Sequence, residues 1–194
     1  TWVAYCRGGF EAEAAADLRR LAALIDATVV VDAAPSSAIV LARGNARELS
    51  RIEDALVTAP PVFARSIFVG SDALALPAAT EGGARADRVT PLLAAIESRR
   101  SAGDGPWRSV WVEYPDTNEG KALSPLARSL ESRLDAALRA SGALDAGATL
   151  RLHALLTSGA QAYVGTSDDP GLGHWPLGIP RLRMPGSAPS RSTL

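Results

Sequence analysis

The sequence predicts an α+β fold with two small domains and an irregular C-terminal segment, and three observations support this prediction. In the first half, short apolar runs alternate with stretches of helical spacing in the order strand, helix, strand, strand, helix, strand. A glycine-bearing break at 77–87 separates this half from a second mixed α/β half. From residue 168 onward the chain is too rich in proline and glycine for regular structure. We therefore expect domains at 1–77 and 88–167, followed by a linker at 168–194.

Four apolar runs of strand length occupy the first half, at 2–6, 28–31, 38–42 and 66–69. The last of them could continue to Leu76 after an irregularity at Gly70.

Two helices are expected between these runs. The first has an apolar stripe with spacings of four and three residues, formed by Phe10, Ala14, Leu18, Leu21 and Ile25. The second begins at a capping-box pattern of Asn45 and Glu48 and ends before the prolines at 60–61. The whole order is the ferredoxin-like βαββαβ arrangement, with both helices on one face of the sheet.

The second half opens with Thr90 and Pro91, an N-cap and first-position proline that predict a helix with Leu92, Leu93 and Ile96 facing inward. Residues 107–114 alternate as a strand, and residues 150–156 and 160–165 form a hairpin.

A long helix lies between this strand and the hairpin. Its stripe is Leu126, Leu130, Leu134 and Leu138, and it ends at 141–142. Two starts are open, one with Ser124 as the N-cap and one near Asn118.

Composition limits the function classes. The 194 residues carry a formal net charge of −1, so any surface for nucleic acid must be a local patch rather than a property of the whole chain. No apolar run is long enough for a membrane span, and no signal-peptide pattern opens the sequence. The single cysteine, Cys6, is expected to be buried, and no Cys/His cluster has zinc-ligand spacing. We expect a cytoplasmic, monomeric protein with no metal and no membrane partner.

Two loops could be taken for phosphate sites. The loop Arg7-Gly8-Gly9 joins a strand to a helix, so its amides and guanidinium could hold a phosphate, although a plain turn, in which glycines permit unusual dihedral angles, is the favoured interpretation. Gly120-Lys121 is not a phosphate-binding loop, because Pro115 replaces the first glycine and Ala122 the magnesium-binding hydroxyl.

Catalytic patterns are weak throughout. Asp116, Asn118 and Glu119 precede a helix and are typical of capping and turn chemistry. His153 lies in a strand, where a structural or solvent-facing role is expected, and no partner completes a nucleophile–base pair.

The tryptophans divide into two kinds. Trp2, Trp107 and Trp111 lie in expected strands and should belong to the core, whereas Trp175, beside His174 in the tail, could stack on a base. These residues indicate binding rather than catalysis.

Several segments together resemble a known family. They are Y-C-R-G-G-F-E at 5–11, F-A-R at 63–65, D-T-N-E at 116–119, G-I-P-R-L-R-M-P at 178–185 and A-P-S-R-S-T-L at 188–194. In this order they resemble the bacterial ribosomal RNA large-subunit methyltransferase M family, with Gly8 where that family often has proline.

The resemblance implies an S-adenosylmethionine-dependent enzyme that methylates a cytidine ribose 2′-hydroxyl in 23S rRNA. It also implies a ferredoxin-like domain, a THUMP RNA-binding domain and a Rossmann-like methyltransferase domain. The first two would fall within this chain, while the cofactor loop and catalytic residues would lie beyond Leu194. No cofactor is therefore expected here, and the chain would serve to position RNA.

On this interpretation the side chains expected to contact RNA are Arg181, Arg183, Arg191, Lys121, Trp175 and His174, with Arg7 and Arg65 as weaker candidates. The tail arginines could instead attach the linker to the second domain. The alternative function is a ferredoxin-like interaction or dimerisation module with no role in RNA binding. A hydrolase of acylphosphatase type is disfavoured, because no asparagine stands at a suitable strand end.

Overall fold

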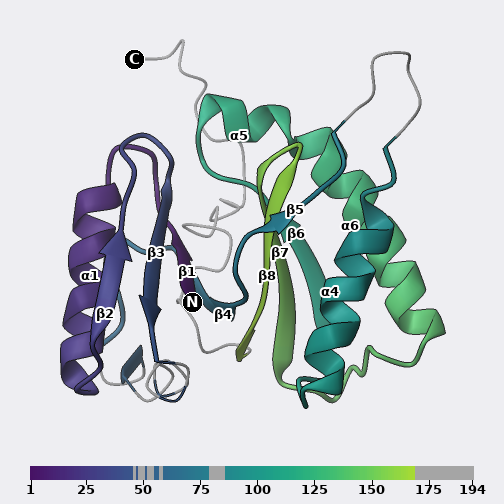
Figure 1. Cartoon of the computed structure of the whole chain (residues 1–194), viewed down its shortest axis with the longest axis horizontal. Helices are drawn as coiled ribbons and strands as arrows, with labels where there is room; N and C mark the ends of the chain where they lie inside the picture. The colour runs from purple at the N-terminus through teal and green to yellow at the C-terminus, as the bar shows by residue number, and fades with distance from the viewer. Residues whose placement is uncertain (46, 48–50, 52–54, 57–58, 79–85, 169–194) are drawn as a thin grey trace, which may run out of the picture.

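A computed structural model describes residues 1–45, 47, 51, 55–56, 59–78 and 86–168 (Figure 1). The first half contributes β1 (Trp2–Tyr5), α1 (Glu11–Leu24), β2 (Val29–Asp32), β3 (Ile39–Gly44), β4 (Ser66–Gly70) and β5 (Leu74–Ala75). The second half contributes α4 (Val89–Ser101), β6 (Ser109–Glu113), α5 (Asn118–Ala122), α6 (Ser124–Ala140), β7 (Leu150–Ser158) and β8 (Gln161–Asp168).

The strands of both halves join in one mixed sheet. Its order is β2-β3-β1-β4-β8-β7-β6, and β5 pairs with β8 beside this path. The β6–β7 pair is parallel, and the other pairings are antiparallel. The mixed α/β class is therefore confirmed. The division into domains at 1–77 and 88–167 stays a prediction, as does the THUMP-like assignment.

The two halves meet where β4 and β5 pair with β8. The β4–β8 pairing is short, with only Val69 opposite Thr166 and Gly70 opposite Gly165. A Cβ atom on Gly165 would lie 2.4 Å from both the Phe68 ring and the Val69 carbonyl oxygen, so only glycine allows the strands to approach this closely.

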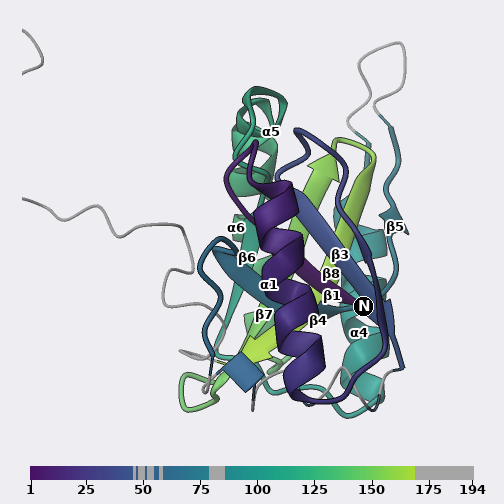
Figure 2. The same ribbon diagram turned by 90° about the vertical axis from the view of Figure 1, so that its left-hand side faces the viewer.

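The helices cover one face of this sheet. Against α1 lie Trp2, Ala4, Cys6, Val40 and Ile67, and against α4 and α6 lie Val110, Val112, Leu152, Ala154 and Val164. Val69, which packs against the α1 core, pairs with Thr166, whose hydroxyl accepts a hydrogen bond from Arg99 of α4 at 3.2 Å. Both cores therefore lie on the same face, with α1 at one end of the sheet and α4 and α6 at the other (Figures 1 and 2).

Burial predictions for the core are confirmed for three residues. Trp2, Trp107 and Cys6 are completely buried. Burial raises the pKa of the Cys6 thiol to about 12, so this cysteine is a small hydrophobic side chain rather than a nucleophile. Trp111 is only half-buried, and the Arg151 guanidinium lies over its ring at 3.4 Å from the centroid.

Two predicted N-caps are wrong. The helix after the break begins at Val89. The amides of Val89 and Thr90, which have no partner within the helix, donate to the carboxylate of Asp87 at 3.1 and 3.3 Å. Thr90 is thus inside the helix, because a longer acidic side chain three residues earlier caps it. Ser124 is likewise the first residue of α6, and no side chain caps that end.

The chain between 117 and 141 combines the two starts left open by the sequence. Thr117 accepts a hydrogen bond from the amide of Gly120 at 2.9 Å and caps α5, which is followed directly by α6. At the other end the amides of Ala143 and Gly142 donate to the carbonyls of Leu138 and Arg139. This is a Schellman motif, and it confirms the predicted end of the helix.

Two further expectations need correction. Phe10 does not face the core, because it precedes α1 and is 37% exposed. β4 ends at Gly70 instead of continuing to Leu76, since the next segment, β5, pairs with β8.

Most of the second helix expected in the first half lies outside the described residues, although Asn45 accepts from the amide of Arg47 at 2.9 Å, as a cap would.

Candidate nucleic-acid interface

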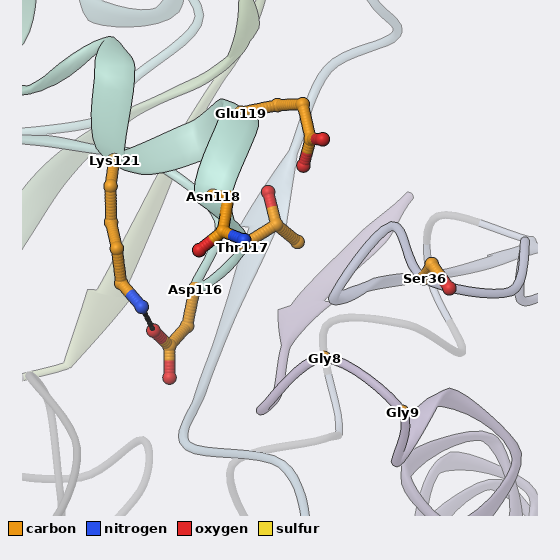
Figure 3. Close-up of a pocket in the computed structure, with 8 residues that line it drawn as sticks. All are labelled: Gly8, Gly9, Ser36, Asp116, Thr117, Asn118, Glu119 and Lys121. Atoms are coloured by element: carbon orange, nitrogen blue, oxygen red, sulfur yellow. Dashed lines mark ion pairs between the residues drawn. The ribbon is translucent and has the colours of Figure 1, made fainter.

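Two loops from different halves of the chain meet at one end of the sheet. We call residues 7–9 and 116–121, the second of which runs into α5, the junction loops. Arg7 and Asp116 form an isolated parallel β-bridge, and a Cβ atom on Gly8 would contact the Asp116 carbonyl oxygen at 3.4 Å. Figure 3 shows the two loops facing each other.

Asp116 forms ion pairs with two cationic side chains. Its carboxylate accepts from Arg65 Nη1 at 2.7 Å and from Lys121 Nζ at 3.2 Å. Burial alone would raise the pKa of Asp116, but the contacts with Lys121 and Arg65 outweigh burial and lower that pKa. Asp116 therefore stays ionised at neutral pH and orients both cations.

A cavity of about 400 Å³ lies between the junction loops. Its lining is polar and comprises Gly8, Gly9, Ser36, Asp116, Thr117, Asn118, Glu119 and Lys121. Lys121 and Glu119 extend on opposite sides of α5 (Figure 3). Gly120 is required here, because a Cβ atom on it would lie 2.0 Å from the carbonyl oxygen of Pro115.

The glycines of the first junction loop do not form a phosphate cradle. The amide of Gly9 donates to both oxygens of the Glu11 carboxylate, at 3.1 and 3.2 Å, and the amide of Ala38 donates to the same group at 2.8 Å. Burial alone would raise the pKa of Glu11, but these amides outweigh burial and lower it. A carboxylate therefore already occupies this position, and the plain-turn interpretation of the glycines holds.

A second polar cluster is buried on the sheet face opposite the helices. Glu113 accepts a short hydrogen bond from the Tyr5 hydroxyl, and its other oxygen lies 2.7 Å from His153 Nδ1. His153 Nε2 lies 2.7 Å from Ser167 Oγ, and its ring stacks on Phe68 with centroids 4.9 Å apart. The predicted structural role of His153 is therefore confirmed.

The order Glu113, His153, Ser167 matches the connectivity of a catalytic triad, but its position excludes that chemistry. Ser167 is only 3% exposed and lies within a strand, so a substrate cannot reach its hydroxyl. Burial, followed by the charge of Glu113, raises the pKa of Tyr5 far above its usual value. The cluster joins β1, β6, β7 and β8 and acts as a polar core.

Three predicted RNA-contacting residues lie together at the junction loops. Arg7 is exposed at the bridge to Asp116, while Arg65 and Lys121 both bind that carboxylate. The sequence analysis missed Asp116 as the residue that brings the two cations together. The other five, His174, Trp175, Arg181, Arg183 and Arg191, lie outside the described residues.

No group of three or more potential ligands that could hold a metal ion occurs among the described residues. No described helix is long and apolar enough to cross a membrane.

Comparison with known proteins supplies the family. The model named "Ribosomal RNA large subunit methyltransferase M, N-terminal" matches residues 87–168, and the "RlmM ferredoxin-like domain" model matches residues 1–68. The chain belongs to the ribosomal RNA large subunit methyltransferase M family. The family resemblance predicted from short motifs is thus confirmed over both halves.

Named relatives extend this family match along the whole chain. Ribosomal RNA large subunit methyltransferase M from Xanthomonas euvesicatoria is 36% identical over 195 aligned positions, covering 99% of this chain and 52% of that protein. The protein of the same name from Xylella fastidiosa strain M23 matches with the same identity and coverage. This chain therefore spans about half the length of the curated relatives it matches.

Likeness to solved structures is more distant. TrmN from Thermus thermophilus has a TM-score of 0.44 and 20% identity, over 85% of this chain and 44% of that chain.

Proposed function

We propose that this chain docks large-subunit ribosomal RNA for a methyl transfer that takes place on another part of the protein. The relatives are named as ribosomal RNA large subunit methyltransferases and are about twice as long as this chain. The S-adenosylmethionine site and the methyl-transfer residues would lie in the part of those relatives that this chain does not span. The target would be a cytidine ribose 2′-hydroxyl of 23S rRNA, and the protein would act in the cytoplasm as a monomer.

One observation carries the docking role. Arg65 and Lys121 form ion pairs with Asp116 at the meeting point of the two halves, and the backbone of Arg7 forms a β-bridge with the same residue. The ion pairs use only part of the donor capacity of these groups, since a guanidinium has five N–H donors and an ammonium three. The remaining donors can bind phosphate oxygens, which provide most of the affinity in RNA recognition.

The acidic residues nearby limit how RNA can approach. Asp116 neutralises part of the charge of Arg65 and Lys121, and Glu119 lines the same cavity. Because Lys121 and Glu119 extend on opposite sides of α5, phosphates should approach along the side that carries Lys121 (Figure 3). The cavity itself is not proposed to admit RNA.

The double variant Arg7→Gln, Lys121→Gln tests this proposal. Both side chains are exposed, and Lys121 has 61% of its side-chain surface accessible, so their loss should not unfold the chain. We expect weaker binding to large-subunit rRNA, and a slope of log affinity against log salt that is flatter by about 1.5 for two lost phosphate contacts. Filter binding or fluorescence anisotropy at several salt concentrations measures both quantities.

A matched control removes an arginine elsewhere. Arg139 lies in the last turn of α6, about 22 Å along the helix axis from Ser124, and pairs with Asp135 at the exposed surface. Arg139→Gln should leave the affinity and the slope unchanged. If the double variant binds with the same slope as the parent chain, the junction loops do not contact RNA.

A further inference from the structure

Two phenylalanines form an exposed stacked pair beside the junction loops. The rings of Phe10 and Phe63 lie with centroids 5.8 Å apart and planes inclined by 18°. They remain 37% and 38% exposed, and the neighbouring Val62 is 77% exposed. We call these three residues the Phe patch. Solvent contact of two large aromatic side chains and a valine at one place is typical of an interaction surface.

The backbone at Phe63 is held in place by hydrogen bonds to a side chain of α1. The buried Asp17 carboxylate of α1 accepts hydrogen bonds from three consecutive amides, those of Val62 at 2.9 Å, Phe63 at 2.7 Å and Ala64 at 3.4 Å. A charged acceptor that holds three amides keeps this loop in one conformation. The backbone that carries Phe63 is therefore already ordered before a ligand binds, so binding to this ring would cost little conformational entropy.

Phe10 is held in a similar way on the other loop. Its amide donates to the carbonyl of Arg7 at 3.1 Å, and its own carbonyl accepts from Ala14 in the first turn of α1 at 3.0 Å. Both rings therefore project from fixed backbone.

Each loop of the Phe patch also carries an arginine. Arg7 precedes Phe10 by three residues, and Arg65 follows Phe63 by two. The two loops are connected directly, since the amide of Arg65 donates to the carbonyl of Tyr5 at 2.9 Å. An aromatic platform with cationic residues on the same two segments matches unpaired nucleic acid, in which a base stacks on a ring while phosphates contact the cations. A purely apolar protein surface would not require the arginines.

We infer that an unpaired nucleobase of RNA stacks on the Phe10–Phe63 pair while Arg7 and Arg65 contact the adjacent phosphates. The inference rests on the proposed function and adds to it a site for single-stranded RNA. The base extends an existing stack of two rings to three. Because every base has a π-face, this contact strengthens binding without selecting a sequence.

Phe63→Leu tests the stacking, because leucine keeps an apolar side chain of similar size but has no aromatic face. We expect the full chain to lose about 5- to 30-fold in affinity for large-subunit rRNA, with the salt slope unchanged because no charge is removed. Phe63→Trp should bind as tightly as the parent, and its added fluorescence should be quenched by RNA. Phe10→Leu provides an independent second variant on the other loop.

Val30→Ala serves as the control, since Val30 is 71% exposed on edge strand β2 and belongs to no proposed contact. If the parent binds rRNA with a steep salt dependence but both leucine variants bind equally well, the stacking site is wrong while the docking function stands. If the parent does not bind rRNA, both the stacking site and the docking function are wrong. If the leucine variants instead abolish self-association measured by light scattering and leave RNA binding intact, the patch is a protein interface and the inference is wrong.

Discussion

At the scale of single residues, the sequence predicted which side chains are buried more readily than which polar groups are hydrogen-bonded to each other. Trp2, Trp107 and Cys6 stand in apolar runs, and all three are buried as predicted. The bonds of Glu113 could not be predicted, because His153 is 40 residues away and Tyr5 is 108 residues away in the chain. Alternation along a strand indicates which face a side chain occupies, but not which polar group lies opposite on a distant strand.

The buried cluster around Glu113 should be a major contributor to stability. Glu113→Ala removes the buried carboxylate that accepts from the Tyr5 hydroxyl and contacts His153 Nδ1, so we expect a loss of about 2–4 kcal/mol in the free energy of unfolding. Glu113→Gln keeps the size and one acceptor, and should lose about 1–2 kcal/mol. Urea denaturation followed by circular dichroism measures both values.

Glu97→Ala is the control for this measurement. Glu97 pairs with Arg100 at the exposed surface of α4, and its loss should change stability by less than about 0.5 kcal/mol. Equal stabilities for Glu113→Ala and Glu97→Ala would contradict the account of the cluster.

At the scale of elements, the apolar stripe of α6 was predicted correctly, while the starts of two helices were not. Leu130, Leu134 and Leu138 are buried, as their spacing indicates. Caps are harder to locate, because several polar residues near a helix start can reach the same free amides, and Asp87 does so in place of Thr90. Glu11 shows a further case, since it begins α1 but binds the amides of the loops beside it.

The Glu11 contacts should make stability depend on pH. The pKa of Glu11 is lowered in the folded state, so its contribution is fully present above its usual pKa of 4.5 and is lost as the pH falls through the lower folded value. We expect Glu11→Gln to be less stable than the parent by about 1–2 kcal/mol at pH 7, and the difference to narrow as the pH falls below 4.5. Denaturation at several pH values measures this.

Glu13→Gln is the matched variant, because Glu13 lies in the same first turn but is exposed. It should stay within about 0.5 kcal/mol of the parent at pH 7. A stability difference for Glu11→Gln that is constant or grows on acidification would show that its carboxylate is not the source.

At the scale of the whole molecule, the sequence predicted two mixed α/β halves but not the single sheet that unites them. The connection rests on the pairing of β4 and β5 with β8, strands that are far apart in the sequence and carry no local pattern that predicts the pairing. The same long-range contact explains the candidate site. Arg7, Arg65 and Lys121 were each identified from the sequence, but only the joined sheet places them around Asp116. The cationic residues of the candidate interface could thus be named from the sequence, but their arrangement around Asp116 could not.

The most direct test of the docking role is the salt dependence of binding between the unmodified chain and large-subunit rRNA. Small-subunit rRNA serves as the comparison. We predict tighter binding to large-subunit rRNA, with a slope of log affinity against log salt of roughly −2 to −4, as expected when several phosphates are neutralised. No binding to either RNA at low salt would contradict the proposal, and recognition would then belong to the part of the relatives that this chain does not span.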